Sequence, residues 1–180
     1  MSESRLRLLD ATLRLDSMPA AGRDITIRPT DDDRIAIATL IGVTTVDAFA
    51  ATLHAVKFRG GFRVTGTVKA QVTQPSVVSL EPVTQAIDEP VDRIFLPTGE
   101  KEYAGPAGAE VFVDLEGDDL PDHFEGNEAD LTDLVVETVA LAVDLYPRLA
   151  GESLADVVPP SEDLDEKPFA ALAALKAKKD

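Results

Sequence analysis

One stretch of alternating residues constrains the fold of this chain more than any other. From Phe62 to Thr73, small or apolar side chains occupy the even positions and polar or charged side chains occupy the odd ones. Successive side chains of an extended strand point to opposite faces, so the pattern predicts a long strand with one buried face and one solvated face. Arg63 and Lys69 fall on the solvated face.

The residues before this strand predict two more strands and a helix. Residues 5–16 and 23–28 have extended character, and Thr30 followed by three aspartates is typical of a helix start. Gly42 is suited to the end of that helix, whose apolar face is expected at Ile35, Ala38, Leu40 and Ile41. Residues 46–58 fit both a helix and a strand. We interpret their second half as a strand, because Gly60-Gly61 predicts a hairpin into the strand at 62.

The residues after this strand predict an interruption and then more extended chain. Residues 74–76 break the alternation, while 77–83, 87–96 and 110–115 have strand character. The clearest helix is expected at 130–146, capped by Asp130 or Asn127 and ended by Pro147. Its apolar stripe is expected at Leu131, Leu134, Val135, Thr138, Leu141, Ala142 and Leu145.

These elements predict an α+β fold: a mostly antiparallel, curved sheet or partial β-barrel with the 130–146 helix packed on it. We expect one domain at 1–148, an acidic, proline-containing linker at 149–167 and a short basic amphipathic helix at 168–180.

The net charge of −16 is unevenly distributed along the chain. Residues 97–166 carry 20 acidic and 2 basic side chains, whereas residues 1–96 carry 12 and 11. Such an acidic block repels phosphates and favours basic partners, although a solvated, solubilising surface is the commoner cause. The chain has no cysteine, which excludes disulfides and thiolate metal sites. No signal peptide or membrane span is indicated, so a cytoplasmic location is expected.

The acidic side chains do not form a recognisable metal or catalytic motif. Asp31, Asp32 and Asp33 are better explained by helix capping, and the acidic loop at 116–128 does not match a calcium loop. We expect no cofactor. Glu137 lies between apolar turns of the predicted helix, where a structural ion pair or a hydrogen bond to the sheet is favoured over catalysis.

Three blocks of sequence stand out together. The first is VTQPSVVSLEPV at 72–83 with DEPVDRIFLP at 88–97, the second is DLTDLVVETVALAVDLYPR at 130–148, and the third is PFAALAALK at 168–176. In these blocks the chain resembles the YceD family of large ribosomal RNA subunit accumulation proteins, of the alphaproteobacterial type. The motif positions are Ser76, Ser79, Leu80, Glu81, Pro82, Glu137, Pro168 and Phe169. Many relatives carry one or two cysteines where this chain has Ser76 and Ser79, so any thiol chemistry is absent here.

The resemblance implies a non-enzymatic role in large-subunit rRNA accumulation, processing or ribosome assembly, and two modes of binding remain open. The chain could contact an rRNA precursor through local cations on a face with little acid, or bind a basic ribosomal protein through residues 97–166. We favour a combination of the two. The candidate RNA-binding cations are Arg59, Arg63, Lys69, Lys176, Lys178 and Lys179. A metal-dependent RNA-processing enzyme is the weakest alternative, because no group of acids has a recognisable spacing.

Overall fold

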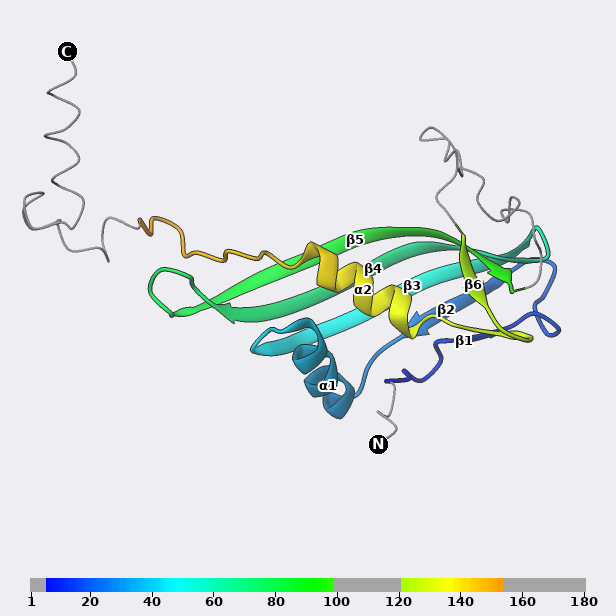
Figure 1. Cartoon of the computed structure of the whole chain (residues 1–180), viewed down its shortest axis with the longest axis horizontal. Coiled ribbons are helices and arrows are strands. Elements are labelled where there is room, and N and C mark those ends of the chain that lie inside the picture. The colour runs from blue at the N-terminus through cyan, green and yellow to red at the C-terminus, as the bar shows by residue number, and fades with distance from the viewer. Residues whose placement is uncertain (1–5, 99–120, 154–180) are drawn as a thin grey trace, which may run out of the picture. The chain divides into compact units, whose positions relative to one another are not determined.

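The computed structural model describes residues 6–98 and 121–153 of the chain (Figure 1). The strands are β1 (Thr12–Arg14), β2 (Arg23–Ile27), β3 (Thr45–Phe58), β4 (Gly61–Pro75), β5 (Pro82–Pro97), β6 (Asp122–Phe124) and β7 (Glu128–Asp130). The helices are α1 (Asp31–Ile41) and α2 (Thr132–Ala142). The expected strand at 110–115 and the expected helix at 168–180 lie outside the described residues.

The chain divides into two compact units. The first contains residues 1–74 and 84–145, and therefore the sheet and both helices. The second contains residues 75–83 and 146–180. The predicted domain limits stay a prediction.

The first unit is built on a five-stranded sheet with the order β2-β3-β4-β5-β6. Strands β2, β3 and β4 pair antiparallel, and β5 pairs with β6 in parallel. A bulge lies at Asp47, whose carboxylate accepts hydrogen bonds from Thr45 Oγ1 (2.9 Å) and Thr73 Oγ1 (2.7 Å). The prediction of an α+β fold with a mostly antiparallel sheet is confirmed. The sheet is not closed into a barrel, because β2 and β6 are its two ends in the observed order.

The alternation from Phe62 to Thr73 separates a buried face from an open face, as predicted. Phe62, Val64, Val68 and Val72 are completely buried in the single hydrophobic core, and the Phe62 ring lies 5.5 Å from that of Phe124. Gly66 interrupts this row with φ +153°, and a Cβ there would lie 2.2 Å from the carbonyl oxygen of Thr52. Glycine is therefore required at this close approach of β3 and β4.

Helix α1 begins and ends where the sequence predicts. The Thr30 hydroxyl accepts from the Asp33 N–H (3.2 Å), the Asp33 carboxylate accepts from the Thr30 N–H (2.9 Å), and Gly42 closes the helix at φ +74°. This reciprocal pair is a capping box. The predicted apolar face is only partly right, because Ile37 and Ala38 are buried while Ile35 and Leu40 are exposed.

Helix α2 is shorter than expected and uses a different face. It ends at Ala142, where the Gln85 side chain donates to the Ala142 carbonyl (2.7 Å) and accepts from the Asp144 N–H (2.9 Å). Pro147 therefore does not end it. Leu141 and Leu145, assigned to the apolar stripe, are 76% and 78% exposed, and Val136 and Val139 are buried in their place. Leu131 is the N-cap residue, although the Asp130 carboxylate does accept from the Thr132 N–H (2.9 Å).

Three predictions for the strands need correction. Residues 45–58 are strand throughout, since β3 pairs along its length with β4. Residues 77–79 form a turn, so the segment 77–83 is not an extended strand. The predicted strand at 5–16 is reduced to β1, which pairs only with β7 in a separate two-stranded sheet. Within the described ranges, no helix is long and apolar enough to span a membrane.

Candidate nucleic-acid interface

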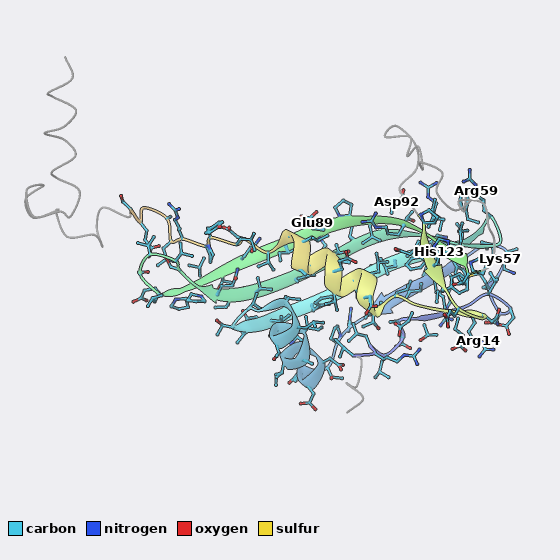
Figure 2. The ribbon with its side chains drawn as sticks, in the orientation of Figure 1. Arg14, Lys57, Arg59, Glu89, Asp92 and His123 are labelled. Carbon is cyan, nitrogen blue, oxygen red and sulfur yellow. The ribbon has the colours of Figure 1, made fainter. Side chains whose placement is uncertain are left out.

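Exposed cations gather at the end of the sheet where β3 turns into β4, and Figure 2 labels two of them, Lys57 and Arg59. Arg59 occupies this turn with φ +46°, and its guanidinium carbon lies 5.0 Å above the centre of the Phe58 ring. Such stacking holds a guanidinium in place while leaving its N–H groups available. Arg59 is thus positioned at an exposed tip, as an anion-contacting residue must be.

Two further cations at this end were missed by sequence reasoning. Lys57 lies one residue before the end of β3, on the same parity as Ala55, and Ala55 is the register partner of Arg23 on β2. Lys57 and Arg23 are therefore diagonal neighbours on one face. Both are exposed, and no carboxylate forms an ion pair with Lys57, Arg23 or Arg59 in the part of the chain that the structure describes. We call these three residues the hairpin-end cations.

The open face of the sheet is not the acid-poor surface that the sequence analysis expected. Arg63 Nη2 lies 2.7 Å from Asp92 Oδ2, and Lys69 Nζ lies 2.7 Å from Asp88 Oδ2. The hydrogen bond from Arg63 holds the pKa of the Asp92 carboxyl below its usual value. Arg63 and Lys69 do share one face, as predicted, but aspartates on β5 balance both charges.

The other three candidate cations, Lys176, Lys178 and Lys179, lie outside the described residues, as do the motif positions Pro168 and Phe169. Among the six candidates, the structure brings Arg59, Arg63 and Lys69 onto one hairpin. Of these three, Arg59 is the one whose charge no described carboxylate balances.

Residues 76–81 separate β4 from β5 and belong to the second unit, and we call them the strand break. They are organised around a carboxylate that the sequence analysis did not identify. Glu152 accepts hydrogen bonds from the Ser76 hydroxyl (2.5 Å), from the Ser79 hydroxyl and from the Leu149 N–H (2.9 Å). The bond from Ser76, followed by the one from Ser79, lowers the pKa of Glu152. Ser76 is completely buried. The two serines thus bind a side chain of their own unit, more than 70 residues away in sequence.

The other motif positions of the break shape its turn. The N–H of Ser76 donates to the carbonyl of Glu81 (2.7 Å), and Leu80 adopts φ +65° between them. Leu80, Glu81 and Pro82 are exposed. Val77 N–H donates to the Pro147 carbonyl (2.9 Å), which joins the turn to the segment that carries Glu152. These contacts show a structural role for the break.

Glu137 does not behave as expected. It is exposed on α2, and it makes no hydrogen bond or ion pair with the sheet among the described residues, so the predicted structural contact is wrong. It borders a groove that also contains Glu89 and Asp122. Across residues 6–98 and 121–153, no three histidine or acidic side chains gather closely enough to hold a metal ion.

Three comparisons with known proteins were informative to different degrees. No curated protein and no solved structure matches the chain. A family model described as "Large ribosomal RNA subunit accumulation protein YceD" matches residues 64–176. This range begins within β4, includes the strand break with Ser76 and Ser79, and covers α2. Because the match spans more than half of the 180 residues, the chain belongs to the YceD family.

Proposed function

We propose that this protein is a non-enzymatic binding factor that supports the accumulation of large-subunit ribosomal RNA by contacting a precursor RNA in the cytoplasm. The family match supports the rRNA role. The observation that supports direct RNA contact is the group of hairpin-end cations, Arg23, Lys57 and Arg59, at one end of the sheet.

The charge distribution determines how an RNA would approach. Phosphate contacts with Lys and Arg release condensed counterions, and this release provides most of the sequence-independent affinity. On the open face the cations are balanced by Asp88 and Asp92, so this surface offers no net attraction. An RNA is therefore directed to the hairpin end, and few phosphates are contacted. Binding of this kind is weak, and its salt dependence is shallow because the slope is proportional to the number of phosphates contacted.

The test combines cells with charge-reversal variants of the full chain. In cells lacking the protein, the ratio of large-subunit to small-subunit rRNA should fall, and the wild-type chain should restore it and sediment with precursor particles at low salt. The variant Lys57→Glu/Arg59→Glu should bind a large-subunit rRNA fragment at least tenfold more weakly. Recovery of the wild-type protein only in the ribosome-free fraction under gentle salt would contradict the proposal.

A matched control separates local contact from overall charge. Arg28 is exposed just after β2, at the opposite end of that strand from Arg23. Arg28→Glu therefore makes the same charge change as the single variant Arg59→Glu, but away from the hairpin end. It should leave RNA affinity within about twofold, because long-range charge is screened by salt, whereas Arg59→Glu should weaken binding clearly more. Equal weakening by the two kinds of variant would show a non-local effect.

An acidic module for a basic ribosomal protein, without RNA contact, is the second candidate. The net charge of −16 favours it. Binding to naked rRNA at physiological salt distinguishes the two, because a purely acidic module would be repelled by phosphates. Nothing among the described residues supports the third alternative, a metal-dependent enzyme.

A further inference from the structure

Strand β5 has a long outer edge without a neighbouring strand. On the side away from β4, the only pairing among the described residues joins Phe95, Leu96 and Pro97 to β6. Positions 84–94 therefore present a row of backbone groups that no described strand covers. Pro90, in the middle of β5, lacks an N–H and is typical of an edge strand. An uncovered edge of this length is a template for an added strand.

A groove of about 580 Å³ runs beside this edge, between β5 and α2. Its lining carries four carboxylates, Glu89 and Asp92 on β5, Asp122 on β6 and Glu137 on α2, against one cation, Arg93. Asp92 is paired with Arg63, whereas Glu89, Asp122 and Glu137 form no ion pair in the described structure, so the groove keeps an excess of negative charge. Leu134 and Leu141 add apolar surface between them. Figure 2 shows Glu89 and Asp92 following one another along β5.

We propose that an extended, Lys- and Arg-rich segment of a partner protein adds as a strand to the outer edge of β5. Main-chain hydrogen bonds to positions 84–94 provide part of the affinity, and alternate side chains of the added strand enter the groove. There their cationic ends meet Glu89, Glu137 and Asp122, while their aliphatic stems cover Leu134 and Leu141. The site selects for positive charge at every second residue of the partner.

Other occupants fit this surface less well. Nucleic acid would bring phosphates against the carboxylates. A second copy pairing β5 with β5 would bring Glu89 and Asp92 toward their own equivalents. The chain's own residues 99–120 carry seven acidic side chains and one basic side chain, so their charge also opposes the groove. Two explanations remain, an acidic edge that only prevents aggregation and occupation of the groove by the chain's own basic residues 168–180, and both predict that an added peptide does not bind.

The proposal is tested with the full chain and a 12-residue probe peptide that alternates lysine with valine. Fluorescence anisotropy at low salt measures its affinity, and hydrogen exchange reports on residues 84–94. We expect binding with slowed exchange there, and at least tenfold weaker binding by Glu89→Gln/Glu137→Gln. The control Asp10→Asn/Asp32→Asn removes the same charge from exposed positions outside the groove and should change affinity less than threefold. A glutamate–valine peptide should not bind.

Backbone pairing has its own test. The same peptide methylated at alternate backbone nitrogens on one edge should lose affinity, because it keeps its charge but cannot pair with β5. Any of three results would overturn the proposal. These are no binding of the lysine–valine peptide, equal affinities of Glu89→Gln/Glu137→Gln and Asp10→Asn/Asp32→Asn for it, or unchanged hydrogen exchange at residues 84–94. The proposal does not depend on RNA contact: Lys57→Glu/Arg59→Glu, which tests the hairpin end, should leave peptide binding intact.

Discussion

Neutralising the two aspartates of the open face should create an RNA-binding surface where the native protein has none. In the variant Asp88→Asn/Asp92→Asn, Arg63 and Lys69 keep their positions but lose the opposing charges at 2.7 Å. Both pairs are exposed, with side chains between 41% and 64% accessible, so each contributes at most about 1 kcal/mol to stability. The fold should therefore remain intact.

The magnitude follows from counterion release. Each new phosphate contact steepens the plot of log Kobs against log salt by about 0.7 for a single strand and about 0.9 for a duplex. Two contacts add about 1.4–1.8 to the slope, so that raising salt fourfold weakens the variant about 7- to 12-fold more than the wild type. The assay is fluorescence anisotropy with a labelled large-subunit rRNA fragment at several salt concentrations.

The control for this experiment is Asp10→Asn/Asp32→Asn, which removes two exposed acids from elsewhere on the first unit. It makes the same change in net charge and should leave the slope unchanged, because long-range charge is screened within about 10 Å at 0.1 M salt. An unchanged slope in Asp88→Asn/Asp92→Asn, or an equal change in the control, would refute the idea that local ion pairs decide where RNA binds.

Three further predictions concern the scaffold and its pH dependence. Phe62→Ala removes a fully buried ring that packs on Phe124 and should lower the free energy of unfolding by about 3–5 kcal/mol, measured with urea. Gly66→Ala places a Cβ against the Thr52 carbonyl and should cost about 1–3 kcal/mol, whereas an increase in stability would contradict the close approach. At Asp130, desolvation raises the pKa, but hydrogen bonds from Thr132 and Arg7 outweigh it, and the net pKa is lowered. The contribution of Asp130 to the free energy of unfolding is thus complete above the unfolded pKa of about 4 and is lost as pH falls through the lower folded pKa. Asp130→Asn should therefore weaken the dependence of the free energy of unfolding on pH, measured from pH 2 to 6.

Local signals predicted the elements whose stabilising contacts are local. The capping box joins Thr30 to Asp33, three residues later, and the alternating residues of β4 are those that alternate between buried and open faces. Residues 46–58 are ambiguous in the sequence because alanine favours a helix while the spacing allows a strand. Pairing with β4 decides this conflict, and pairing is a tertiary property.

Helix α2 shows that apolar periodicity predicts neither where a helix ends nor which of its apolar residues are buried. Leu141 and Leu145 continue the apolar stripe, but the helix ends at Ala142 because Gln85, 57 residues earlier, binds its last turn. A stripe shows which residues are apolar, and only the packed neighbour decides which of them are buried.

The positions of the aspartates opposite Arg63 and Lys69 could have been predicted from the sequence. Asp88 and Asp92 are four residues apart on one strand and hence on one face, and a hairpin folded at residues 76–81 brings that face beside β4.

The strand break shows why a motif can mark a structural joint rather than a reactive site. Ser76 and Ser79 occupy positions where the family resemblance places cysteines, and both hydroxyls donate to Glu152. A carboxylate with two lone-pair-bearing oxygens can accept from both serines and from the Leu149 N–H at once, and so joins residues 75–83 to 146–153. Glu152 lies 73 residues beyond Ser79 in a segment with no periodicity, so no spacing rule identifies it as the partner. The two serines thus connect two segments within the second unit, and this connection requires only a hydrogen-bond donor at each position.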